Sequence, residues 1–436
     1  MSRTAAASRM DFPHAETVEA ALPAVELPTF REVRYDPPAP TLDDPAETAR
    51  AELDDLPLDD LDAGAQVAVG LGSRGITDVV PVARAVIDEL QSRDFEPVVV
   101  PAMGSHGGAT LEGQERTLSS IGLTEEALGC PIDPRMDTEH LGISAIGGEV
   151  HHATAALDAD GVLAINRVKA HTNYDGEFES GLTKMLTIGL GKQVGAKSVH
   201  EQALVEGYEA AIESAFEVVT ERSPVLGGIA LVENFHDETA TIEGVPVSAL
   251  PDREAALLER AYEYMPTLPY KDLDVLVVDR IGKDVSGAGM DTNVIGRYEV
   301  LNTDDPDSPA IQRIVVRGLT DSTHGNGQGL GLADVTTAAV AAELDLDQVY
   351  TNALTSGSLS KARLPVVLPN DRLALETAVT TVGPYDPETI RVAWIRDTSH
   401  LSSFRVSEAL AAEDHDHVEV VGSAPLSFDD GTASFE

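Results

Sequence analysis

The sequence predicts an α/β fold, with two α/β domains, mainly parallel sheets and a cleft between the domains. Continuous apolar runs of strand length alternate with amphipathic helical segments, as in parallel sheets that are covered on both faces. The chain has 436 residues, enough for about two or three domains. The stretch EYMPTLPYKDLD interrupts the alternation, so we expect the domain boundary near residue 267.

The elements follow in chain order. Residues 1–63 are rich in Pro, Ala and acids, and we expect an N-terminal extension that packs on the first domain, with ALPAVELPTFREVRY as an edge strand or clasp. In the first domain, residues 64–267, we expect the strands QVAVGLG, FEPVVVPAM, GVLAINRV and GGIALVEN and the helices VVPVARAVIDELQSR, LEGQERTLSSIG and YEAAIESAFEVVTER. In the second, residues 268–436, we expect the strands DVLVVDRIG, RIVVRGLT and RVAWIRD and the helix GLADVTTAAVAAEL.

Composition excludes several classes of function. Acidic residues number 74 against 30 basic ones, a formal net charge of −44, so we expect no nucleic acid and no anionic membrane as a partner. Acids spread along the whole chain are typical of a cytoplasmic protein from a high-salt organism. Cys130 is the single cysteine, which excludes a disulfide framework and thiolate-ligated zinc or iron–sulfur sites. No apolar run approaches a membrane span, and the first residues lack a signal-peptide core.

The first candidate site is the loop GLGSRG, which follows the first predicted strand. It has the spacing G-x-G-x-x-G and contains Gly70, Gly72, Ser73, Arg74 and Gly75. A glycine turn at a helix N-terminus, next to an arginine, suits a phosphate. The next strand ends in GSHGG, without the acidic residue that would hold the ribose of NAD. A single phosphate is therefore favoured over a dinucleotide, although a tight turn without a ligand gives the same spacing.

Histidines and a lysine follow the later strands, where open parallel sheets bind ligands. The residues are His106 in GSHGG, His171 in INRVKAH, and Lys184 and His200 in GEFESGLTKMLTIGLGKQVGAKSVH. Because histidine titrates near neutrality, two of them in one crevice can exchange protons on both faces of a small substrate. Each residue alone also fits a structural role, for example His171 as a partner of Asp175 or Lys184 as a surface lysine.

The strings GSHGG and NRVKAHTNYDGEFESGLTKML, followed by a histidine, resemble the nickel-dependent lactate racemase family and its N-terminal domain. VPAMGSHGGAT, ESGLTKMLTIGLGKQ, IGKDVSGAGMDTNVIGR and THGNGQGLGLAD are similar to one branch of that family. The resemblance is strongest between about residues 64 and 205. It implies a nickel-pincer cofactor, the nickel adduct of pyridinium-3,5-bisthiocarboxylic acid mononucleotide, and as partners the enzymes that build this cofactor.

The resemblance also implies a role for each candidate. His106 and His171 would be the catalytic histidines, and Lys184 would bind the pincer covalently. His200 would ligate nickel, and Arg74 would contact substrate or phosphate. The loop residues Gly72, Ser73 and Gly75 would hold the mononucleotide phosphate. The implied reaction is racemisation or epimerisation of a small 2-hydroxy acid by a hydride shuttle, in which one histidine takes the hydroxyl proton and the other returns it on the opposite face.

The chain departs from the family pattern in three places. GLGSRG replaces an Asp-rich first loop, and the segment between the second histidine and the lysine is longer and contains Glu177 and Glu179. In the second domain, Lys283 and Arg297 are the weaker candidates for the substrate carboxylate. The alternative function is a phosphate- or nucleotide-binding protein on the same fold without racemase activity. An NAD-dependent dehydrogenase is disfavoured because the acidic residue for the ribose is missing.

Overall fold

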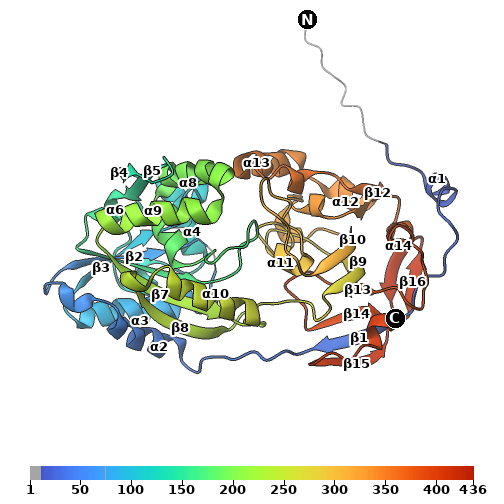
Figure 1. Cartoon of the computed structure of the whole chain (residues 1–436), viewed down its shortest axis with the longest axis horizontal. Helices are drawn as coiled ribbons and strands as arrows, with labels where there is room; N and C mark the ends of the chain where they lie inside the picture. Colours follow the sequence, from blue (N-terminus) through green and yellow to red (C-terminus); the bar gives the residue numbers. More distant parts are fainter. Residues whose placement is uncertain (1–10, 74) are drawn as a thin grey trace, which may run out of the picture. The chain divides into compact units, whose positions relative to one another are not determined.

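The structure, a computed structural model, describes residues 11–73 and 75–436. The chain divides into two compact units, which we call the N-terminal unit (Pro38–Met265) and the C-terminal unit (residues 11–37 together with Pro266–Glu436) (Figure 1). Both are mixed α/β structures with mainly parallel sheets, which confirms the predicted fold class. In the described residues, no helix combines the length and the apolar character needed to cross a membrane.

A five-stranded sheet in the order β3-β2-β6-β7-β8 forms the centre of the N-terminal unit. Its strands are parallel except β8, which pairs antiparallel with β7 at the edge. The strands are β2 (Gln66–Leu71), β3 (Glu96–Pro101), β6 (Gly161–Arg167), β7 (Val225–Glu233) and β8 (Thr239–Pro246), and a separate hairpin pairs β4 (Thr138–Ile143) with β5 (Glu149–Ala153). The four strands predicted for this domain are therefore confirmed.

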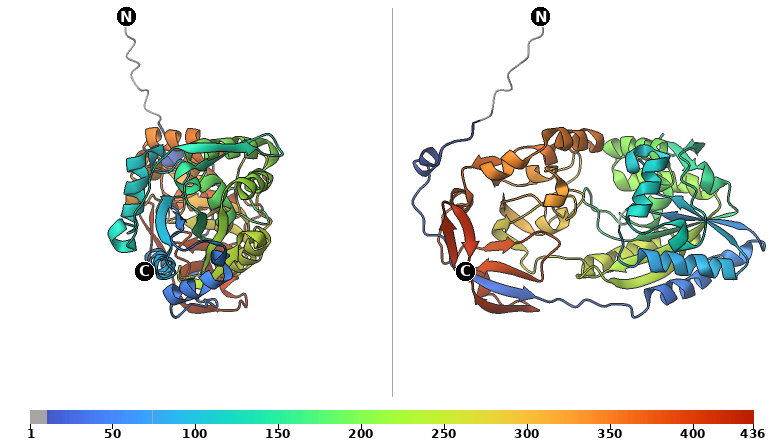
Figure 2. Two further views of the ribbon diagram at one scale, coloured as in Figure 1. Left: turned by 90° about the vertical axis from the view of Figure 1, so that its left-hand side faces the viewer. Right: turned by 180° about the vertical axis from the view of Figure 1, so that it is seen from behind.

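Helices cover both faces of this sheet, as the two additional views show (Figure 2). They are α2 (Pro45–Ala51), α3 (Val79–Ser92), α4 (Leu111–Ser120), α5 (Glu125–Leu128), α6 (Thr154–Leu157), α7 (Leu182–Lys184), α8 (Lys192–Glu206), α9 (Tyr208–Arg222) and α10 (Asp252–Tyr264). One hydrophobic cluster packs α2 and α3 against the sheet, and another packs α8, α9 and α10 against the opposite face. All nine residues of β7 are buried, which is why its sequence is continuously apolar.

An eight-stranded sheet in the order β12-β11-β10-β9-β13-β14-β1-β15 forms the C-terminal unit. The first five strands in that order are parallel. Each of the last three, β14, β1 and β15, pairs antiparallel with the strand before it. The strands are β1 (Phe30–Tyr35), β9 (Asp272–Val278), β10 (Ala310–Val316), β11 (Val335–Thr337), β12 (Val366–Leu368), β13 (Val392–Ile395), β14 (Ser403–Ser407) and β15 (Val418–Ser423), with the hairpin β16 (Leu426–Asp429) and β17 (Thr432–Phe435). The helices are α1 (Ala15–Glu19), α11 (Thr292–Ile295), α12 (Ala338–Glu343), α13 (Leu346–Ser356), α14 (Asp371–Thr380) and α15 (Glu408–Ala411).

Three expectations about the elements need correction. The extension 1–63 does not pack as a whole on the first domain, because β1 lies between β14 and β15 in the C-terminal sheet and only residues from 38 onward belong to the N-terminal unit. For the same reason β1 is an interior strand and not an edge strand. The segment GLADVTTAAVAAEL is not one helix, since its β-branched residues form β11 before α12 begins.

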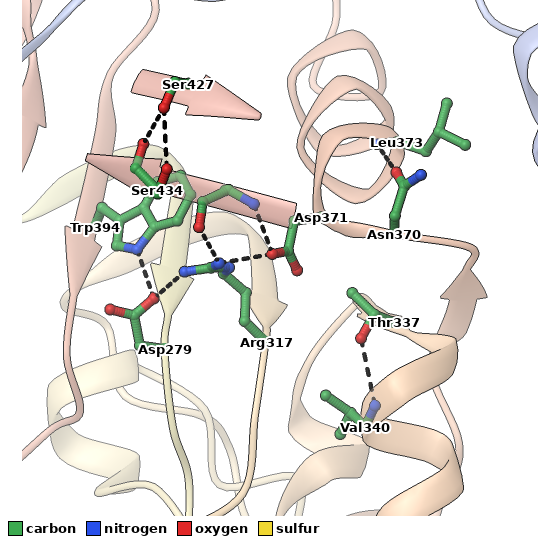
Figure 3. Close-up of polar contacts among 11 residues, drawn as sticks. Asp279, Arg317, Thr337, Val340, Asn370, Asp371, Leu373, Trp394, Ser427 and Ser434 are labelled. Atoms are coloured by element: carbon green, nitrogen blue, oxygen red, sulfur yellow. Dashed lines mark hydrogen bonds and ion pairs between the residues drawn. The ribbon is translucent and has the colours of Figure 1, made fainter. Parts of the chain in front are cut away.

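Ion pairs tie the carboxyl ends of the central strands of the C-terminal unit together (Figure 3). Arg317 follows β10 and pairs with Asp279, which follows β9, and with Asp371 at the start of α14. Its guanidinium also lies 4.8 Å from the centre of the Trp394 ring, whose indole N–H donates to Asp279 at 2.7 Å. The carbonyl of Ala433 in β17 accepts a further bond from Arg317 at 2.9 Å. The network therefore joins the sheet to α14 and to the C-terminal hairpin.

Candidate functional site

The loops after β2 and β3 lie against each other. His106 caps a short 3-10 turn, and its Nδ1 lies 2.6 Å from the hydroxyl oxygen of Ser73 in the GLGSRG loop. Gly72 in the same loop contacts a third segment, because a Cβ there would lie 3.2 Å from the Met185 methyl group. The structure thus brings Ser73 and His106 into direct contact, with Gly72 beside the segment that contains Lys184.

A buried lysine and a buried glutamine fix the loop that carries His106. The Lys192 ammonium donates to the carbonyl of Pro101 at 2.7 Å and to Gln114 Oε1 at 3.1 Å. The Gln114 amide in turn donates to the carbonyl of Gly104 at 2.9 Å. Lys192 is completely buried, and this burial lowers its pKa to about 8. Gly107 has φ of 69° and touches the backbone of helix α4, so a side chain there would displace the loop.

His171 lies in a loop that returns on itself. The backbones of Lys169 and Ser180 exchange hydrogen bonds at 2.9 and 3.2 Å and close the loop at its base. The Asn173 N–H donates to His171 Nδ1 at 3.2 Å, so the neutral ring carries its proton on Nε2. The backbone N–H of His171 donates to the carboxylate of Glu179, which is completely buried. Local contacts therefore fix both the backbone and the tautomer of this histidine.

Lys184 ends the short helix α7 and is followed by a π-helical turn, Met185–Gly189. π-Helical turns are rare and occur frequently at functional sites. The buried carboxyl of Glu254 in α10 accepts from the Thr183 N–H at 2.9 Å and from the Thr183 hydroxyl at 3.3 Å. Burial raises the pKa of Glu254 to about 7. The helix that carries Lys184 is therefore held from its N-terminal side by one carboxyl group.

A row of rings connects His171 with His200 of α8. The His171 ring centre lies 4.6 Å from that of Tyr174, which stacks on Tyr208 at 4.8 Å, and Tyr208 meets His200 edge-on at 6.2 Å. Desolvation lowers the pKa of His200 to about 4, and the positive charges of Lys184 and His106 act in the same direction. His200 as a residue is exposed, and the lowered pKa leaves its ring neutral at pH 7.

Five candidates of the N-terminal unit thus occupy one region: Ser73, His106, His171, Lys184 and His200. Gly75 is exposed and has open space around it, and Arg74 lies outside the described residues. The expected helix N-terminus does not directly follow the GLGSRG loop. Helix α3 begins at Val79, and Asp78, which precedes it, accepts from the Thr239 hydroxyl at 2.6 Å. An acid at that helix end makes it less suited to a phosphate than the sequence indicates.

The two candidates of the C-terminal unit differ in what their side chains bind. The Arg297 guanidinium donates to the carbonyls of Leu332 and Ile311, both at 2.9 Å, and pairs with Asp334 at 2.9 Å. These contacts hold the strands of its own unit. Lys283 donates to the carbonyl of Gly287 at 2.6 Å, within its own loop. Arg297 therefore has a structural role, which makes it a poor candidate for binding a substrate carboxylate.

The donors around His200 are compatible with a metal cofactor but not with a metal site made of protein alone. Within residues 11–73 and 75–436, no three His, Cys, Asp or Glu side chains gather in a way that could hold a metal ion. His200 is a neutral imidazole near a lysine amine, and neutral imidazole is a good ligand for Ni(II). These residues fit a group that attaches to Lys184 and brings the remaining nickel ligands itself.

Sequence reasoning missed the residues that support the candidates. The sequence pattern does not point to Glu254, Lys192, Gln114 or Tyr208, and it shows Glu179 only as an extra acid. All but Tyr208 are fully buried polar side chains. A sequence signal exists for Glu179 alone, because it lies between the second histidine and the lysine. The others come from helices whose packing partners cannot be inferred from chain order.

Comparisons with known proteins give a distant structural likeness. No family model matches the chain. No curated protein matches it in sequence. Among solved structures, the chain is similar to the structure of the lactate racemase apoprotein from Thermoanaerobacterium thermosaccharolyticum, with 13% sequence identity, 85% of this chain and 89% of that chain covered, and a TM-score of 0.46. At this level the likeness says nothing about the chemistry of this chain, which depends on its own residues.

Proposed function

We propose that the protein is a racemase or epimerase of a small 2-hydroxy acid and that it carries a nickel-pincer mononucleotide. The observation that supports this most strongly is the gathering of His106, His171, Lys184 and His200 from four separate segments of the N-terminal unit. Two histidines, one amine and one neutral imidazole are the side chains that this chemistry needs. Other buried groups hold the segments that carry His106, His171 and Lys184.

Three of these residues would hold the cofactor. The Lys184 amine would form the covalent link, and His200 would ligate nickel through its neutral ring, since a protonated imidazole has no lone pair to offer. Ser73 lies in the loop that would receive the phosphate, next to the Lys184 segment. When bound, the pincer would supply a reversible acceptor for the hydride from carbon 2.

The two remaining histidines would move protons. In the neutral His171 ring Nδ1 accepts from the Asn173 N–H, so the proton lies on Nε2 and this N–H can donate a hydrogen bond to a substrate oxygen. The Ser73 hydroxyl contacts Nδ1 of His106 and orients that ring. One histidine, as a neutral imidazole, would take the hydroxyl proton, and the other, as an imidazolium, would donate a proton on the opposite face, which interconverts the two enantiomers. Lys283 is the candidate that remains for the substrate carboxylate, together with Arg74.

The intact mass of the chain tests this proposal. The protein would be co-expressed with enzymes that build the pincer, and nickel would be quantified on the same sample, with Lys184→Arg as the matched variant. We expect an added mass of mononucleotide size on Lys184 and about one nickel per chain, and neither in the variant. An unmodified mass without nickel, under conditions that load a known lactate racemase, would contradict the proposal. It would favour the alternative, a phosphate- or nucleotide-binding protein on the same fold.

A further inference from the structure

Glu179 is the acidic residue that lies inside the loop carrying His171. Its carboxylate accepts from the backbone N–H of His171, from the Tyr262 hydroxyl at 2.7 Å and from the Gly176 N–H at 3.4 Å. The Glu179 carbonyl accepts from the Tyr174 hydroxyl at 3.1 Å, and Tyr174 is the ring next to His171. The carboxyl therefore joins the backbone of the histidine to helix α10, and its own backbone holds the neighbouring ring.

We propose that Glu179 is a positioning residue, which fixes the imidazole of His171 by holding its backbone N–H and the aromatic ring beside it. The inference rests on the proposed function for its catalytic meaning, because it assigns no contact between Glu179 and substrate. Positioning matters here, since proton transfer needs heavy atoms within hydrogen-bond distance, and a displacement of about 1 Å can cost roughly 100-fold in rate.

The energetic cost of Glu179 argues that it serves more than the fold. A carboxyl with no solvent exposure is costly to ionise, and burial raises the pKa of Glu179 to about 7. The His171 N–H, Tyr262 and the Gly176 N–H act in the opposite direction, and Asp175 adds to the increase. The titratable groups around the carboxyl and the adjoining Tyr174 are His171, Asp175, Tyr208, Glu209, Glu254 and Tyr262.

The chain offers a matched control two residues away. Glu177 lies in the same loop but is exposed, so Glu177→Gln removes the same charge without removing the bonds to His171 and Tyr262. Glu179→Gln keeps the shape and one acceptor oxygen but can no longer ionise. A merely structural role predicts that the two variants differ in stability alone. A positioning role predicts that they also differ in how the His171 amide responds to pH.

The first arm of the experiment uses the protein without cofactor. Histidine labelled with 15N gives signals from only twelve residues, and His171→Asn assigns the amide of His171. We expect this amide resonance to titrate with a midpoint of about 7 in the wild type and in Glu177→Gln, and not to titrate in Glu179→Gln. Tyr262→Phe removes a donor to the carboxylate and should move the midpoint to higher pH. An unchanged titration in Glu179→Gln would overturn the inference.

The second arm uses the cofactor-loaded enzyme. We expect Glu179→Gln to lower kcat by about 10- to 100-fold with little change in KM, and Glu177→Gln to stay within about twofold of wild type. Equal kcat in the two variants would overturn the positioning role. A wild-type protein without racemase activity would contradict the proposed function only, because the resonance of the cofactor-free protein decides whether Glu179 controls His171.

Discussion

The two units place polar residues at the same position of a parallel sheet and use them differently. In the C-terminal unit, the charged residues that follow β9 and β10, Asp279 and Arg317, pair with each other and with groups on α14 and β17 (Figure 3). In the N-terminal unit, the residues that follow β2 and β3, Ser73 and His106, bond to each other on the surface of the loops. Strand ends are therefore a good place to search for a site but do not identify one.

What separates the two regions is where the buried charge lies. In the C-terminal unit, the residues at the strand ends form the ion pairs themselves. Their charges neutralise each other, and the pairs stabilise the sheet. In the N-terminal unit, Arg167 and Glu233 at the ends of β6 and β7 also form an ion pair. Three other buried ionisable groups, Lys192, Glu179 and Glu254, lie behind the candidate residues and bond mainly to backbone. The comparison predicts that substitutions in the two regions fail in different ways.

The largest effect is expected for the histidines. His106→Asn and His171→Asn remove a group that accepts or donates a proton, and we expect each to lower kcat by about 10²- to 10⁴-fold in the loaded enzyme. The free energy of unfolding should change by less than about 1 kcal/mol for His106→Asn, because that residue is exposed. Chiral analysis of the product from each pure enantiomer measures the loss. Full activity in either variant would show that this imidazole has no part in the reaction.

A smaller effect, on stability, is expected for Arg317→Met. The change leaves the carboxylates of Asp279 and Asp371 without their partner, at a cost of about 3–5 kcal/mol when a largely buried pair is broken. Trp394 is the only tryptophan and contacts this network, so its fluorescence reports unfolding of the C-terminal unit. The exposed neighbour Arg280 provides the control, since Arg280→Met should shift the transition by less than about 0.5 kcal/mol. Equal shifts of the unfolding transition in both variants would show that the Arg317 ion pairs do not stabilise the C-terminal unit.

The sequence predicts the sheet strands better than their partners. Runs such as VLVV and GGIALVE are continuously apolar because both faces of the strand are buried, so these strands could be recognised from sequence alone. Strand β1 could not be assigned to its sheet, because pairing with β14 and β15 joins residues about 370 to 390 positions apart. Three-residue β11 is too short for a period to show.

The residues of the candidate site also differ in how far the sequence predicts them. His106, His171, Lys184 and His200 could be proposed from the sequence because each occurs in, or follows, a distinctive string. The buried groups that hold them could not, because Glu254 resembles any acid of an amphipathic helix until the fold turns it inward against α7. Candidate reactive residues can be recognised in local sequence, whereas the buried residues that hold them in place depend on tertiary packing.

Glu254 provides the smallest expected effect and tests whether buried charge behind the site is costly to the fold. Its pKa is raised to about 7 in the folded chain, so between about pH 4.5 and 7 the unfolded chain loses the proton first and stability falls as pH rises. The loss from Glu254 is up to about 3 kcal/mol, and Glu254→Gln should remove that part of the slope and leave the part from Glu179, whose pKa is also raised to about 7. Circular dichroism during denaturation measures it, with the exposed Glu259→Gln on the same helix as control. Because Trp394 lies in the other unit, its fluorescence transition should be the same in all three proteins. A slope as steep in Glu254→Gln as in the wild type would mean that the Glu254 carboxyl is already ionised without penalty, and then the N-terminal unit would use its buried charges as the C-terminal unit does.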